Sequence, residues 1–139
     1  GNQMYDLKTM VDSSVRRSYN DAGGLAAKDK RSATVMVWNY HDDDVIKPAL
    51  PAEIIIHGVP AKSATVTQYI IDDKHSNSYE VWKKMGSPQS PTKEQIATLE
   101  KAGQLEKLSV MKNQLVKQGK LIIATSLAQQ AVVLLKVDW

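Results

Sequence analysis

Residues 33–40 read ATVMVWNY, which is the strongest β-strand signal in the sequence. Side chains alternate between the two faces of a strand, so the run divides into two sets, Val35, Val37 and Asn39 against Met36, Trp38 and Tyr40. Both sets are largely apolar, which is typical of a strand inside a sheet. We therefore expect a central strand, with Trp38 in the core.

The residues around this run predict further strands and tight turns. Asn20-Asp21 and Gly23-Gly24 carry turn chemistry, and residues 25–27 form a hairpin with the central strand through a turn at residues 28–31. Apolar or alternating runs predict strands over residues 53–57, 63–71, 105–111, 120–125 and 131–137. Residues 117–120, KQGK, have the composition of a hairpin turn between two of these strands.

Two short helices are predicted in the middle of the chain. Asn77 is a suitable N-cap with Glu80 at the reciprocal position, and this helix ends at Gly86. Thr92 with Gln95 forms a capping box for the second helix, which carries Ile96 and Leu99 inward and ends at Gly103.

Short connections between strands favour an antiparallel sandwich over an α/β sheet, which would need a helix after nearly every strand. The sequence thus predicts a mainly β protein, an antiparallel β-sandwich of about seven or eight strands with two short helices inserted between the fifth and sixth strands. Residues 1–12 are expected to be a tail or linker from a preceding domain, and residues 13–139 the sandwich.

The composition limits the function classes. The chain has 139 residues, 42% hydrophobic and 24% charged, which suits one globular domain. A net charge of +3 with acids and bases interspersed disfavours nucleic-acid binding. No apolar run is long enough for a membrane span and no signal peptide is recognisable. The absence of cysteine leaves the compartment open, and a periplasmic or extracellular parent protein is compatible with it.

Two segments carry a family resemblance: residues 35–44, VMVWNYHDDD, and residues 71–92, IDDKHSNSYEVWKKMGSPQSPT, continuing through residues 95–99. They resemble the C-terminal region of glycoside hydrolase family 39, which includes β-xylosidases and, more distantly, α-iduronidases. The resemblance extends from about Leu25 to the end, where residues 127–139 are similar to the last strand of the family's sandwich.

The resemblance implies a β-sandwich that packs against a catalytic (β/α)8 barrel. Such a barrel needs roughly 250 residues, more than this chain has. The family's catalytic pair are two glutamates, the acid/base one following an Asn, and none of the five glutamates here follows an Asn. We therefore expect no catalytic residue, metal or cofactor in this chain. A strand that such sandwiches borrow from ahead of the barrel would be missing, leaving an open sheet edge or an apolar patch.

Candidate contact residues with the barrel or its sugar cluster in the second segment: Asp72, His75, Ser76, Asn77, Tyr79 and Trp82. The first segment, residues 35–44, is expected to contain a structural motif formed by Trp38, Asn39, Tyr40 and His41. Asp72 and Glu80 resemble the carboxylate pair that a glycosidase needs, but a loop contact for Asp72 or Asp73 and a helix cap for Glu80 are the simpler interpretation. His41 with Asp42, Asp43 and Asp44 offers oxygen ligands without the spacing of a calcium loop, and His57 lacks a partner at ligand spacing.

The leading interpretation is a non-catalytic domain that stabilises a β-xylosidase-like barrel. The first alternative is a carbohydrate-binding module for xylo-oligosaccharides or other glycans, which would need a row of exposed aromatic side chains on one sheet face. An active hydrolase and an unrelated protein-interaction sandwich are the remaining alternatives. The expected partners are the parent barrel, an oligosaccharide or a second copy of the chain, with no nucleic acid and no membrane.

Overall fold

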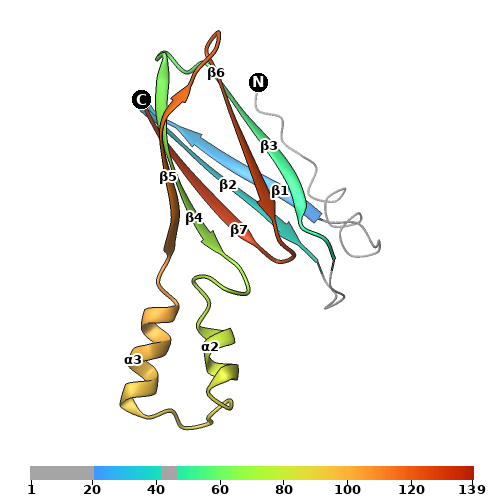
Figure 1. Cartoon of the computed structure of the whole chain (residues 1–139), viewed down its shortest axis with the longest axis vertical. Coiled ribbons are helices and arrows are strands. Elements are labelled where there is room, and N and C mark those ends of the chain that lie inside the picture. Colours follow the sequence, from blue (N-terminus) through green and yellow to red (C-terminus); the bar gives the residue numbers. More distant parts are fainter. Residues whose placement is uncertain (1–20, 42–46) are drawn as a thin grey trace.

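Two antiparallel sheets face each other in the computed structural model, which describes residues 21–41 and 47–139. The large sheet has the strand order β1-β2-β7-β4-β5 and the small sheet pairs β3 with β6 (Figure 1). The strands are β1 (Asp21–Lys28), β2 (Ser32–Tyr40), β3 (Leu50–His57), β4 (Ser63–Ile71), β5 (Glu106–Leu115), β6 (Lys120–Leu127) and β7 (Val132–Asp138). The predicted mainly β, antiparallel class is confirmed.

The core lies between the two sheets. Alternate residues of β2, β4 and β7 point toward the small sheet, and Val66, Val133, Leu135 and Val137 have no exposed surface. From the small sheet, Leu121 and Ile123 of β6 complete the same cluster. Because the core contains no phenylalanine and few aromatic rings, packing depends on branched aliphatic side chains, which suit a pleated surface.

The predicted hairpins form. β1 pairs with β2 over its whole length, and β2 pairs on its other side with β7, so the run at residues 33–40 is a central strand as expected. The turn at residues 117–120 is closed by a bridge between Lys117 and Lys120, with φ of 51° at Gln118 and 72° at Gly119. Two consecutive residues with positive φ match the twist of a tight hairpin.

Two helices leave the sandwich after β4. Helix α2 (Ser78–Lys84) is capped by Asn77, and α3 (Lys93–Ala102) has the predicted capping box of Thr92 and Gln95. The helices contact each other and lie side by side beyond the end of the sheets (Figure 1). None of the helices in the described residues is long and apolar enough to cross a membrane.

The structure corrects several expectations. The helices lie between the fourth and fifth described strands, not between the fifth and sixth, because four described strands precede them. Gly23-Gly24 lies inside β1 and makes no turn. Ile96, which was expected to point inward, is 45% exposed. Trp38 is outside the core, on the face of β2 that points away from the small sheet. The expected tail at residues 1–12 lies outside the described residues.

Candidate functional site

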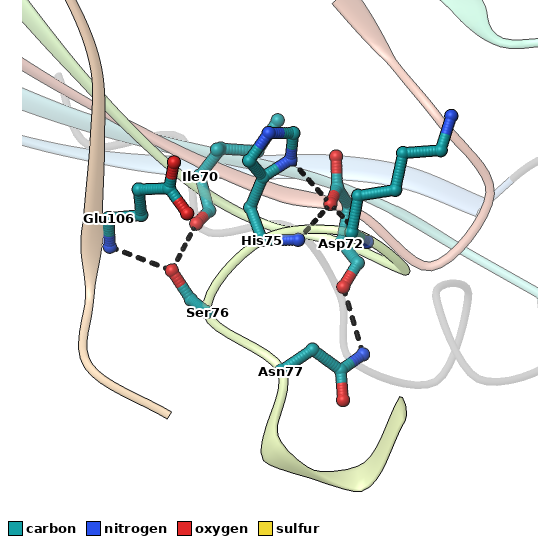
Figure 2. A network of polar contacts seen from close by, with 7 residues as sticks. Ile70, Asp72, His75, Ser76, Asn77 and Glu106 are labelled. Atoms are coloured by element: carbon teal, nitrogen blue, oxygen red, sulfur yellow. Dashed lines mark hydrogen bonds and ion pairs between the residues drawn. The ribbon is translucent and has the colours of Figure 1, made fainter. Parts of the chain in front are cut away.

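The loop between β4 and α2 is organised around the carboxylate of Asp72. Its Oδ1 accepts hydrogen bonds from the backbone N–H groups of Lys74 (2.8 Å) and His75 (2.7 Å) and lies 2.8 Å from His75 Nδ1 (Figure 2). Burial would raise the pKa of the Asp72 carboxyl, but the hydrogen bonds from Lys74 and His75 outweigh it and hold that pKa below its usual value. The carboxylate is therefore ionised at neutral pH and closes the loop.

Ser76 connects this loop to the neighbouring strand. Its hydroxyl donates to the carbonyl oxygen of Ile70 (2.7 Å) at the end of β4. Ser76 Oγ also accepts a hydrogen bond from the backbone N–H of Glu106 (2.7 Å) at the start of β5 (Figure 2). A single side chain thus joins the two strands at the point where the helical hairpin leaves the sheet.

Asn77 joins the loop to α2. Its Nδ2 donates to the carbonyl oxygen of Asp72 (2.9 Å), and its Oδ1 accepts from the backbone N–H of Glu80 (3.1 Å). The Glu80 carboxylate lies 2.6 Å from Lys83 Nζ. Asp72 and Glu80, the carboxylates that resembled a catalytic pair, thus both have local structural partners.

His75 and Tyr79 present groups to the surroundings. When the imidazole of His75 is neutral, its contact with Asp72 requires the proton on Nδ1 and leaves Nε2 as a hydrogen-bond acceptor. The His75 side chain is 29% exposed, and Tyr79 is 60% exposed. Within the predicted contact set, Tyr79 is thus exposed and His75 is partly exposed.

Trp82 makes its contacts within the helical hairpin. Its indole Nε1–H donates to the carbonyl oxygen of Pro88 (3.0 Å), and its ring stacks on Tyr79 with 5.7 Å between centroids. Lys83 Nζ lies 4.9 Å from the centre of the Tyr79 ring on the same helix. Trp82 therefore holds the segment that follows α2 and supports the exposed Tyr79 ring.

Two residues of the first motif, Asn39 and His41, are buried at one end of the sandwich. Asn39 is 2% exposed, and its Nδ2 donates to the carbonyl oxygens of Leu127 (3.2 Å) and Ala128 (3.3 Å). His41 is 6% exposed and its Nε2 contacts Lys47 Nζ. Asp42, Asp43 and Asp44 lie outside the described residues. Within the described part, no group of three or more His, Asp or Glu side chains could hold a metal ion, and His57 is exposed.

An apolar groove lies at one open side of the sandwich. It has a volume of about 280 Å³ between β1 and β2 of the large sheet and β3 of the small one, with Ala26, Val35 and Ile54 among its lining residues. In the described chain, β3 pairs only with β6, so its other edge has no strand beside it. The groove is a candidate for the open edge or apolar patch expected from the sequence, which stays a prediction.

The family model for glycosyl hydrolases family 39 matches residues 3–114. This chain belongs to glycosyl hydrolase family 39. The match includes the whole network from Asp72 to Asn77, the helical hairpin and most of the large sheet.

Solved structures of other proteins share the fold of this chain. An enzyme from Xanthomonas axonopodis pv. citri aligns with a TM-score of 0.70 and 19% identity over 83% of this chain and 25% of its own. A monomeric β-xylosidase from Caulobacter crescentus CB15 gives 0.63 and 17% over 83% and 26%. A bacterial orthologue of human α-L-iduronidase gives 0.60 and 17% over 86% and 22%. The chain thus spans about a quarter of the length of these proteins.

Sequence reasoning expected an open edge or an apolar patch without placing it, and it missed the outer face of the large sheet as a surface. Leu25, Tyr40, Ile71 and Val110 are each at least 41% exposed on that face. The two-sided apolar pattern of residues 33–40 was a signal for it, because such a strand needs cover on both faces. Without the strand order, that pattern could not show which face the small sheet covers.

Proposed function

We propose that this chain is a non-catalytic accessory domain of a longer glycosidase resembling the β-xylosidases, where it packs against and stabilises a catalytic (β/α)8 barrel. The observation that carries the proposal is the alignment of 83–86% of this chain with only 22–26% of three family enzymes. A (β/α)8 barrel occupies roughly 250 residues, and this chain has 139. The hydrolytic chemistry therefore belongs to the part of the parent enzyme outside this chain.

The isolated chain tests this proposal in two parallel measurements. We expect no hydrolysis of an aryl xyloside and no heat of binding on titration with xylo-oligosaccharides. Hydrolysis by the pure chain would overturn the proposal. Binding without hydrolysis would support a second function for the domain.

That second candidate is carbohydrate binding, and one observation favours it. Trp38, Tyr40 and Tyr69 lie on the same outer face of the large sheet, and Tyr40 is 50% exposed. Aromatic rings with polar tips can stack on a sugar and bond to its hydroxyl groups. Under this function Tyr40→Ala abolishes oligosaccharide binding, whereas Tyr79→Ala, on the helical hairpin, leaves it intact.

We also propose that His75 and Tyr79 contact the barrel or its bound sugar, while Asp72, Ser76, Asn77 and Trp82 hold them in place. In the full-length enzyme, Tyr79→Ala is expected to lower activity or thermal stability without unfolding the isolated chain. Ile96→Ala on α3 is a control, since Ile96 is also exposed. If the full-length Tyr79→Ala and Trp82→Ala variants both kept stability and activity, this role would be wrong.

A further inference from the structure

The face of the large sheet that points away from the small sheet carries two apolar rows that run across four of its five strands. Residues in register on successive strands form two rows across it, Leu25, Met36, Leu134 and Tyr69 in the first and Gly23, Trp38, Val132 and Ile71 in the second. At the β5 edge, Val110 stands opposite Thr67 on the same face. The first row ends on β5 at the charged Lys107, which stands opposite Tyr69. On β7, the charged side chains Lys136 and Asp138 lie toward one end and contact each other at 3.7 Å.

No described residue covers this face. The small sheet packs on the opposite side, where it forms the core, and the two helices lie beyond the end of the sheet (Figure 1). Leu25 is 56% exposed, Tyr40 50%, Val110 47% and Ile71 41%. A contiguous apolar patch of this kind on a soluble domain marks an interaction surface.

The dimensions of the face indicate a large occupant. Five strands spaced about 4.8 Å apart make it about 19 Å wide, whereas one helix with its side chains is about 10 Å across. A single peptide or helix would leave part of the face open. The occupant must therefore present a broad, preformed surface.

We propose that the outer face of the large sheet is the surface on which the parent glycosidase barrel docks. This inference rests on the proposed function, and it adds which face carries the contact. Three quarters of each aligned family enzyme lies outside the segment that matches this chain. A barrel in the same polypeptide meets this face at a high effective concentration, an advantage that a second copy lacks.

Side-chain oxidation by hydroxyl radicals, read by mass spectrometry, tests the inference in the isolated chain and in the full-length enzyme. Met36, Trp38 and Tyr69 on the face are expected to react several-fold more slowly in the full-length enzyme. Equal reactivity in the two proteins, while the full-length enzyme hydrolyses xylosides, would overturn the docking face and leave the proposed function standing. A full-length protein without glycosidase activity would instead overturn the proposed function. Sedimentation of the isolated chain as a dimer that protects the same residues would assign the face to a second copy.

Charged substitutions give a second test with a matched control. Leu25→Lys and Val110→Lys place a charge on the outer face, and Ile122→Lys places one at a position 55% exposed on the small sheet, away from the core. All three isolated variants are expected to stay folded, as circular dichroism would show. In the full-length enzyme, Leu25→Lys and Val110→Lys should lower the temperature at which activity is lost, and Ile122→Lys should not. An equal effect of all three would contradict the inference.

Discussion

Asn39 Nδ2 lies 3.2 Å from the carbonyl oxygen of Leu127, so the central strand of the large sheet is joined to the end of β6 across 88 positions of sequence. The backbone of Asn39 adds two further contacts, with the carbonyl of Ala131 and the N–H of Gln130. This one residue therefore holds the connection between β6 and β7, where the chain returns from the small sheet to the large one.

We predict that Asn39→Ala lowers the free energy of unfolding by about 1–3 kcal/mol, because buried carbonyl groups lose their donor. Urea unfolding followed by circular dichroism measures the change. Ser126→Ala, at an exposed position of β6, is the control and should stay within about 0.5 kcal/mol of the wild type. Similar losses in both variants would show that the Asn39 bonds are not the cause.

The second prediction concerns Gly23, which lies under the ring of Trp38. A Cβ at this position would come 2.7 Å from Trp38 Cε2 and Cζ2, closer than real contacts allow. The ring must shift in Gly23→Ala, and we expect a loss of about 1 kcal/mol or more in the free energy of unfolding. Gly103→Ala is the control, since its nearest contact would be an ordinary 3.5 Å. A neutral Gly23→Ala would mean that Trp38 is free to move aside.

Local sequence patterns predicted the helices, strands and turns well. They could not predict contacts between residues far apart in the sequence. The caps at Asn77 and Thr92 and the turn at residues 117–120 depend on a few neighbouring side chains, so the sequence alone locates them. The pair Gly23-Gly24 was predicted to form a turn because glycine is common in turns. The contact of Gly23 with the Trp38 ring on the neighbouring strand could not be predicted from that pattern.

In the loop between β4 and α2, contacts between near neighbours could likewise be predicted, and contacts between distant residues could not. A loop role for Asp72 could be predicted, since its partners lie within three residues. The bond from the backbone of Glu106 to Ser76 could not, because it spans 30 positions and depends on how β4 and β5 pair. Likewise, the face of β2 that enters the core is decided by the small sheet, not by the pattern in β2.

The third prediction is a pH dependence from Asp72. Its pKa is lowered in the folded protein, so its contribution to stability is present above the unfolded value of about 3.9 and is lost as the pH falls through the folded pKa. Asp72→Asn should cost about 1–2 kcal/mol at pH 7, and the difference from wild type should shrink below about pH 4. Urea unfolding at a series of pH values measures it, with the exposed neighbour in Asp73→Asn as control. A difference that grows in acid would contradict the network.

The fourth prediction separates the two aromatic residues of α2. Trp82→Phe keeps a ring for stacking but removes the Nε1–H that donates to Pro88, so the segment between the helices loses its tie to α2. We expect faster tryptic cleavage after Lys84, with a loss of no more than about 1 kcal/mol in global stability.

Tyr79→Phe is the matched control for that experiment. It keeps the stacked ring beside Trp82 and removes only a hydroxyl from a residue that is 60% exposed, so cleavage should match the wild type. If both variants were cleaved faster, the stack rather than the bond to Pro88 would hold the segment. If neither were, the bond would be dispensable, and Trp82 would become a candidate for direct contact with the barrel instead of a support for Tyr79.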